Sequence, residues 1–256
     1  MFTLANLSAL NSIGLTELDS VKLLNRVDSK FAFPESKLSI IISQIQANYF
    51  ILNIDEKNMF KYETVYLDNN HFDFYLAHHN GKPNRNKVRY RLYSDSNLRY
   101  FEIKKRIKDA RTDKYRIKIN HSDAILQPEE LALLEQHQIK DAANLNSKMW
   151  INYDRITLVS KNFNERVTLD LNLTFHNNKG NKQALNGIVI AEVKQNKFSR
   201  NSPFVRVLRD LNIKETRISK YAIAVAYLND AQKHHQFKEK IIKLNKIINN
   251  GTNRPN

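Results

Sequence analysis

Lysine and arginine recur at every second position in three neighbouring segments, 86–94, 98–106 and 111–119. Side chains two apart on a β-strand share a face, so each segment gathers basic residues on one side and apolar residues on the other. The basic side contains Lys87, Arg89 and Arg91, then Lys104 and Arg106 beside Glu102, and then Lys114, Arg116 and Lys118. Arginine meets phosphate oxygens through paired donors, and lysine acts as a point charge. This pattern suits the binding of an anion: nucleic acid, an acidic lipid or a phosphorylated small molecule.

Three later segments repeat the arrangement. Their polar sets are Tyr153 with Arg155, Arg166 with Thr168 and Asp170, and Glu192 with Lys194. A polar face that meets water would explain any one of these strands. Ordinary solvent faces mix polar residue types and both charges, however, and like charges on neighbouring strands repel. The repetition therefore favours a charged interior, with a solvated face as the alternative.

The composition narrows the chemistry further. The 256 residues include 41 Lys and Arg against 26 Asp and Glu, which gives a net charge of +15. The absence of cysteine excludes a disulfide framework, a thiolate metal site and a cysteine nucleophile. No Walker A, GxGxxG or nucleophile-elbow motif occurs, and the pairs His78-His79 and His234-His235 lack the spacing of a metal site.

The elements that would position the basic residues form one series. Helices are predicted at 34–47, 71–79, 128–137, 201–211 and from Ser219, a residue that suits an N-cap. Strands are predicted at 49–53, 60–68, 86–94, 98–106, 111–119, 148–159, 165–175 and 186–195. We expect an α+β fold, a closed eight-stranded antiparallel β-barrel with helices packed outside. Residues 1–229 would form this domain, and 230–256 a basic C-terminal helix and tail.

The N-terminal residues 1–10 lack the basic and apolar regions of a signal peptide. No segment approaches the roughly 20 apolar residues that a membrane span needs. We therefore expect a cytoplasmic protein, and its charge is compatible with recruitment to the inner face of a membrane.

Several short motifs, in order, resemble those of a known family. They are Arg26-Val27-Asp28-Ser29-Lys30-Phe31, Glu63-Thr64-Val65-Tyr66-Leu67-Asp68, Lys87-Val88-Arg89-Tyr90-Arg91, Phe101-Glu102-Ile103-Lys104, Glu192-Val193-Lys194 and Ser219-Lys220-Tyr221. From about Leu15 to Leu228 the chain resembles the VTC domain, the polyphosphate polymerase part of vacuolar transporter chaperone complexes. That domain belongs to the triphosphate tunnel metalloenzymes, the CYTH-like superfamily. The ordered set is much more specific than any single motif.

The resemblance implies a tunnel of eight strands, in which basic residues hold the triphosphate of ATP and the growing polyphosphate. It assigns catalytic or orienting roles to Lys30, Arg155, Arg217 and Lys220. It assigns phosphate binding to Arg89, Arg91, Lys104, Lys114, Arg116, Tyr153 and Arg166, with the register of Lys114 against Arg116 left open. Glu192 is the expected ligand of Mn²⁺ or Mg²⁺.

One departure bears on the branch of the superfamily. CYTH relatives carry a Glu-x-Glu-x-Lys signature where this chain has Arg26-Val27-Asp28-Ser29-Lys30, which favours the VTC branch. We therefore expect transfer of the ATP γ-phosphate to a polyphosphate chain. Two alternatives remain: metal-dependent hydrolysis of tripolyphosphate or a nucleoside triphosphate, and a non-catalytic module that binds polyphosphate or other anions. The expected partners are ATP and polyphosphate or triphosphate. A separate membrane protein is a further candidate partner, and no specific nucleic acid is expected.

Overall fold

One large sheet organises the chain in the computed structural model, which describes residues 7–20, 27–107, 112–122, 124–197, 199, 201–228 and 233–252. Arg26 of the first motif and residues 253–256 of the expected tail lie outside the described residues. The strands are β1 (Asn11–Ile13), β2 (Val27–Pro34), β3 (Tyr49–Leu52), β4 (Met59–Asp68), β5 (Arg85–Tyr93), β6 (Leu98–Arg106), β7 (Thr112–Ile119), β8 (Asn146–Ser160), β9 (Glu165–Asn177), β10 (Lys182–Leu185) and β11 (Ile188–Gln195). The eight predicted strands are therefore confirmed, and the eight-residue β2 and the short β1 and β10 are added to them.

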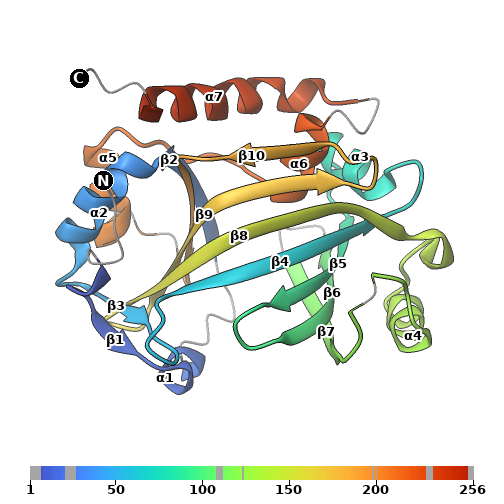
Figure 1. The fold of residues 1–256 in the computed structure, drawn as a ribbon, viewed down its shortest axis with the longest axis horizontal. Coiled ribbons are helices and arrows are strands. Elements are labelled where there is room, and N and C mark those ends of the chain that lie inside the picture. The colour runs from blue at the N-terminus through green and yellow to red at the C-terminus, as the bar shows by residue number, and fades with distance from the viewer. Residues whose placement is uncertain are drawn as a thin grey trace.

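The strands follow the order β2-β11-β9-β8-β4-β5-β6-β7, and each neighbouring pair is antiparallel (Figure 1). β10 pairs with β9, while β3 pairs with β8 and, in parallel, with β1. Long strands such as β8 and β9 bend with the sheet, and a register shift near Asn152 marks an irregularity between them.

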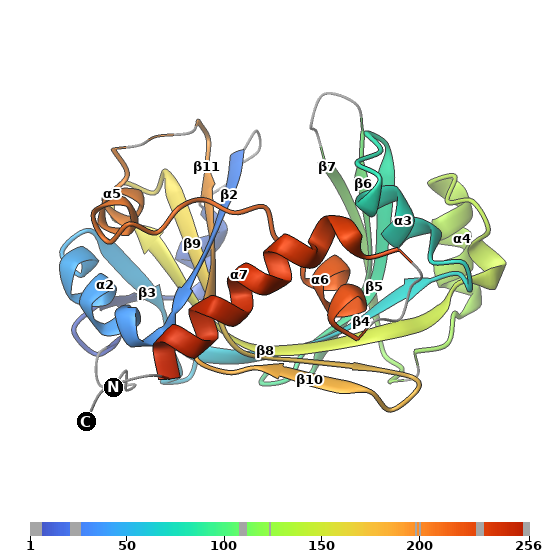
Figure 2. The same cartoon turned by 90° about the horizontal axis from the view of Figure 1, so that it is seen from above.

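The prediction of a closed barrel is wrong for this structure. Within the described residues, β2 and β7 end the path and are not paired with each other, and they stand apart on either side of the middle of the view in Figure 2. The outer edge of β2 instead pairs with a later segment of the chain that contains Glu215 and Thr216. Phe31 forms a bridge with Glu215, and the backbone N–H of Thr216 donates to the carbonyl of Lys30 at 2.7 Å. The edge that would close the barrel therefore already has a partner.

The helices are α1 (Leu15–Ser20), α2 (Leu38–Ile45), α3 (Asp73–His79), α4 (Pro128–Gln136), α5 (Pro203–Asp210), α6 (Lys220–Tyr227) and α7 (His235–Thr252), with short 3₁₀ turns at Glu35–Lys37 and Ala142–Asn144. α2 and α5 pack on the outer face of β8, β9 and β11, where Ile41, Leu169 and Phe204 are fully buried. α4 packs on the outer face of β5 and β6, against Val88 and Phe101. These contacts leave the opposite face of each strand for the polar residues.

Helix α6 corrects the expectation that all helices pack outside the sheet. Ser219 caps it, as predicted, by accepting from the N–H of Ala222. The ring of Tyr221 stacks on Tyr66, with centroids 4.9 Å apart, and Tyr66 lies directly opposite Arg89 on the polar face of the sheet. α6 therefore lies on the same face as the basic residues, between β2 and β5 in Figure 2. α7 covers it with Phe237 and Leu244, and no helix of the described residues is long and apolar enough to cross a membrane.

Candidate anion-binding site

The polar residues of the predicted strands lie together on one face of the sheet. Directly opposite residues in a ladder share a face, and the register connects Lys30 with Glu192, Lys194 with Arg166, and Arg155 with Asp170. We call this surface the basic face: Lys30, Lys87, Arg89, Arg91, Glu102, Lys104, Lys114, Arg116, Tyr153, Arg155, Arg166, Asp170, Glu192 and Lys194.

The interior of the basic face is not a solvated surface. Arg89 and Arg91 are 6% and 8% exposed, and Glu102 and Asp170 are 0% and 1% exposed. Charged residues are seldom buried this far without partners or a ligand. The prediction of a charged interior is therefore confirmed for these strands, although Lys114 and Arg116 on β7 stay exposed.

Glu102 on β6 is the first of three carboxylates around which the cations gather. The Nε of Arg89 donates to its Oε2 at 2.7 Å, the Nη2 of Arg89 forms an ion pair with the same oxygen at 2.6 Å, and Lys114 forms an ion pair with its Oε1. Burial alone would raise the pKa of Glu102, but the charges of Arg89, Arg91 and Lys114 hold it well below its usual range. Arg116 instead stacks over the ring of Tyr100, with its Cζ 4.6 Å from the centroid. Lys114 is therefore the β7 residue that meets the carboxylate.

Asp170 on β9 is the second carboxylate. Arg155 forms two parallel bonds to it, from Nε to Oδ1 at 2.6 Å and from Nη2 to Oδ2 at 2.9 Å, and Lys220 of α6 contacts Oδ2. Tyr153 lies under both cations, with its ring centre 5.2 Å from the Arg155 Cζ and 4.8 Å from the Lys220 Nζ. Burial raises the pKa of Asp170, yet Arg155 and Lys220 outweigh burial and lower the pKa to about 2.

Glu192 on β11 is the third carboxylate. Lys194 reaches its Oε2 at 2.7 Å, and Lys30 lies 3.8 Å from its Oε1. The Lys30 Nζ also donates to the Ile218 carbonyl at 3.1 Å, in the segment that leads into α6. Burial opposes ionisation of Glu192, but Lys194, Lys30 and Lys104 keep its pKa well below the usual value. The neighbouring lysines therefore favour the ionised form of the Glu192 carboxylate.

The donor set around Glu192 fits a hard divalent cation only together with a ligand. Within the described residues no three His, Asp or Glu side chains group as a metal cage. Mg²⁺ commonly takes one or two protein carboxylates and fills its other positions with water and substrate phosphates. A single Glu192 carboxylate beside Lys30 and Lys194 meets the protein part of that description.

Two lysines of the basic face have no carboxylate within ion-pair distance among the described residues. The Lys87 Nζ donates to the Ser219 hydroxyl at 2.9 Å, and burial followed by the charges of Lys30 and Arg85 lowers its pKa to about 7. The charge of Arg89, together with burial, lowers the pKa of Lys104 well below its usual value. These lysines are held where an anion would stabilise their charged form.

Most of the residues implied by the resemblance meet in these clusters, and Arg217 does not. Arg217 is exposed and forms no ion pair with the three carboxylates; its charge instead acts on Lys240 of α7. Arg166 lies directly opposite Lys194, at the edge of the Glu192 cluster. Glu102, Asp170 and Lys194 complete the site but were not assigned roles from the sequence. Their period-two spacing with the basic residues was the available signal.

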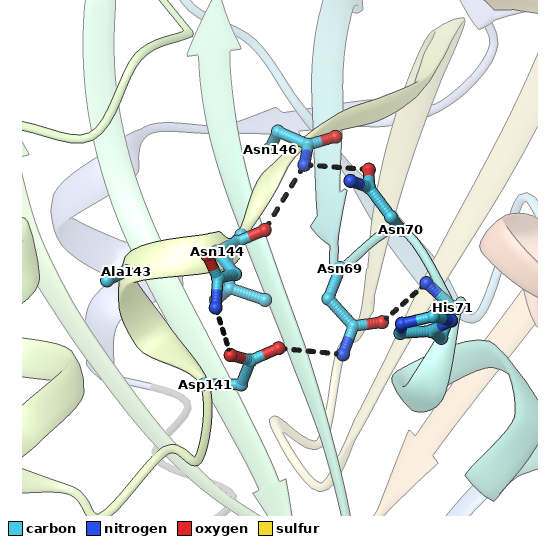
Figure 3. Close-up of a pocket in the computed structure, with 8 residues that line it drawn as sticks. Asn69, Asn70, His71, Asp141, Ala143, Asn144 and Asn146 are labelled. Carbon is cyan, nitrogen blue, oxygen red and sulfur yellow. Dashed lines mark hydrogen bonds between the residues drawn. The ribbon is translucent and has the colours of Figure 1, made fainter.

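A pocket of about 340 Å³ lies elsewhere on the molecule (Figure 3). Its lining residues are Asn69, Asn70, His71, Asp141, Ala143, Asn144, Leu145 and Asn146. Its polar side chains bond mainly to one another, as where Asn69 donates to Asp141 at 3.0 Å. None of the residues predicted for the site lines this pocket. The candidate site is therefore identified by its cluster of charged side chains and not by the pocket.

Residues 25–229 match the family model of the VTC domain. No curated protein matches the chain. A candidate adenylate cyclase from Bacillus halodurans has a similar structure, with a TM-score of 0.50 and 12% identity over 77% of this chain and 96% of that one. A candidate adenylyl cyclase from Hippeastrum, described as having a dominant triphosphatase activity, gives a TM-score of 0.51 and 12% identity over 77% and 94% of the two chains. Likeness at this identity concerns the fold alone.

Proposed function

This chain belongs to the VTC domain family, and we propose that it is a polyphosphate polymerase that uses ATP. The observation that carries the proposal is the basic face, on which buried arginines and lysines gather around only a few carboxylates. Such a face is costly without a polyanion, because like charges repel and burial disfavours ionised groups. A triphosphate or a phosphate chain supplies the missing negative charge.

Phosphoryl transfer asks the protein chiefly for alignment and charge stabilisation. In the proposed reaction a terminal oxygen of the bound polyphosphate attacks the γ-phosphorus of ATP. The bond from the γ-phosphorus to the β–γ bridging oxygen breaks, and ADP leaves with that oxygen. The chain becomes longer by one phosphate, and no water is consumed.

The roles divide between holding and orienting. Phosphate oxygens would be held by Arg89, Arg91, Lys104, Lys114, Arg116, Tyr153 and Arg166. The reacting phosphates would be oriented by Lys30, Arg155 and Lys220, whose positions Glu192 and Asp170 already fix. Arg217 would contribute from the segment before α6, at a greater distance from these clusters. A divalent cation, Mn²⁺ or Mg²⁺, held by Glu192 together with phosphate oxygens would neutralise the charge that builds up during transfer.

Incubation of the purified chain with ATP and Mn²⁺ tests the proposal. The expected products are ADP and long acid-labile phosphate chains, in equal phosphate yield. The same reaction with chelator, or with the Glu192→Gln protein, should give little polymer, because both remove the cation from the phosphates. Lys82→Arg serves as a control, since Lys82 is exposed and outside the basic face.

Two other outcomes would overturn the proposal in different directions. Orthophosphate without any polymer would show a hydrolase acting in the same site. Tight binding of polyphosphate that survives both chelator and Glu192→Ala, with no nucleotide turnover, would show a non-catalytic binding module.

A further inference from the structure

Among the described residues, three buried hydrogen-bond donors on the side of the sheet that carries the basic face have no partner: the Thr168 hydroxyl on β9, the Thr64 hydroxyl on β4 and the Arg91 Nε on β5. Thr64 is 2% exposed and Arg91 is 8% exposed, and these two donors belong to neighbouring strands. Buried polar groups in proteins nearly always have a hydrogen-bond partner, so an unpartnered one needs an explanation. A water molecule or a ligand oxygen are the two candidates for that partner.

The two donors lie side by side. Thr64 and Arg91 are directly opposite each other in the antiparallel β4–β5 ladder. Directly opposite residues have Cβ atoms about 4.5–5.5 Å apart and point to the same side of the sheet. On its other flank, Thr64 faces the apolar Ile151 of β8. The polar surroundings of the Thr64 hydroxyl therefore come from the Arg91 side.

The neighbouring arginine differs in its bonding. Arg89 directs Nε and Nη2 to Glu102 and Nη1 to the Tyr66 hydroxyl at 3.1 Å. The Nε of Arg91 lies 4.0 Å from the nearest Glu102 oxygen, too far for a hydrogen bond. The Arg-x-Arg pair thus contains one arginine whose Nε donates to a carboxylate and one whose buried Nε has no hydrogen-bond partner among the described residues.

We propose that Thr64 and Arg91 form a single phosphate subsite, in which the neutral Thr64 hydroxyl and the Arg91 guanidinium donate to oxygens of the same phosphate group. The proposal rests on the proposed function for the choice of a phosphate chain as the ligand. Arg89, a phosphate-binding residue elsewhere on the basic face, serves this subsite only by position, because its contacts with Glu102 and Tyr66 fix β5 beside Arg91. The guanidinium of Arg91 carries donors and a positive charge, and the Thr64 hydroxyl can donate beside it, which suits an ionised phosphate oxygen.

Calorimetric titration with inorganic tripolyphosphate, without ATP or metal, tests the subsite. Thr64→Val keeps the shape of the side chain and removes the hydroxyl, and it should weaken binding about tenfold, the usual size of a lost hydrogen bond to a charged group. Thr64→Ser keeps the hydroxyl and should bind within about threefold of the unaltered chain. Thr174→Val is the matched control, because Thr174 lies at an exposed position of β9 and should bind tripolyphosphate as the unaltered chain does.

Thermal unfolding of the ligand-free proteins supplies a second measurement. Replacing an unpartnered buried hydroxyl with a methyl group removes an unfavourable burial, so Thr64→Val should unfold at the same or a higher temperature. A lower unfolding temperature for Thr64→Val would overturn the proposal, since it would show that the hydroxyl bonds within the protein or to a structural water. Equal tripolyphosphate affinity for Thr64→Val and Thr174→Val would overturn it as well.

These outcomes are separable from those of the polymerase assay, because binding of tripolyphosphate requires no turnover. A chain that makes no polymer but loses affinity on Thr64→Val retains the subsite and loses the proposed function. A chain that makes polymer with unchanged affinity in Thr64→Val retains the function and loses the subsite. Failure of the unaltered chain to bind tripolyphosphate would overturn the subsite outright.

Discussion

At the scale of single residues, three carboxylates hold the basic side chains of the site in place. Glu102, Asp170 and Glu192 each hold two or three cations that would otherwise repel one another. Arginine and lysine side chains lose considerable rotamer freedom when a ligand fixes them. The carboxylates fix them beforehand, so that a phosphate chain meets side chains already in place. The acidic residues therefore favour binding of an anion, although their charge opposes it.

The two arginines of β5 provide a prediction at this scale. Arg89→Ala removes the principal partner of the fully buried Glu102, and we expect it to lower the free energy of unfolding by about 3 kcal/mol. Arg91→Ala removes a more distant charge and should lower stability much less, while it weakens tripolyphosphate binding strongly. Urea unfolding and calorimetric titration of the two proteins measure both effects. A similar loss of stability in both variants would contradict the difference in their bonding.

Helix α6 links the elements of the fold to the site. Its first residue, Lys220, contacts Asp170, and its N-cap, Ser219, accepts a hydrogen bond from Lys87 of β5. Tyr221 donates to the buried Asp68 at the end of β4, with an oxygen–oxygen distance of 2.7 Å. One short helix therefore contacts charged side chains contributed by three strands: Asp68 of β4, Lys87 of β5 and Asp170 of β9.

Ser219→Ala tests this link between helix and strands. The change removes the N-cap acceptor of α6 and should cost about 1 kcal/mol of stability, which corresponds to a fall of roughly 2–4 °C in the unfolding temperature for a chain of this size. It also releases the Lys87 Nζ, so tripolyphosphate affinity should change as well. Ser43→Ala, at an exposed position of α2, is the control and should leave both measurements unchanged. Loss of stability without any change in affinity would show that Ser219 acts only as a cap.

Local sequence patterns predicted most of the strands and helices. The position of α6 and the open path of the sheet depend instead on contacts between residues that are distant in the sequence. Period-two alternation located β5 to β9 and β11, and the Ser219 N-cap located α6. The position of α6 on the basic face had a signal in its sequence: Tyr221–Ala226 is apolar all round, and a helix of this kind is buried on every side. The open path from β2 to β7 had none, because the partner of an edge strand depends on residues distant in the sequence, here Glu215 and Thr216.

The sequence likewise predicted some features of the candidate site and not others. Alternation alone placed Arg89, Arg91 and Arg155 on shared faces. It could not assign Glu102 to Arg89 or Asp170 to Lys220, because cross-strand register and the approach of α6 are properties of the assembled sheet. The exposed position of Arg217 has the same origin: helical and strand periods do not govern the irregular segment before α6.

At the scale of the whole molecule, the chain carries a net charge of +15, and some of its basic residues lie close together inside the fold. Burial and neighbouring positive charges lower the pKa values of Lys87 and Lys104 there. Burial, followed by the charges of Lys30 and Arg85, brings the pKa of Lys87 to about 7, whereas an unfolded chain keeps lysine protonated to roughly pH 10. Between these values the unfolded state binds the additional proton, so the contribution of Lys87 to stability rises with pH over that range. Below pH 7 the cost of burying its charge is fully present.

A bound polyanion reverses this balance, because its charge favours protonated lysine. Tripolyphosphate binding should therefore take up protons above pH 7, and its affinity should fall as the pH rises from about 7 to 9. Calorimetric titration in two buffers of different ionisation enthalpy measures the uptake directly. Lys87→Arg keeps a permanent charge and should show a smaller uptake at pH 8, while the exposed Lys82→Arg should match the unaltered chain. Comparison of variants cancels any proton taken up by the ligand itself, so equal uptake in Lys87→Arg and Lys82→Arg would show that Lys87 is already charged before the anion binds.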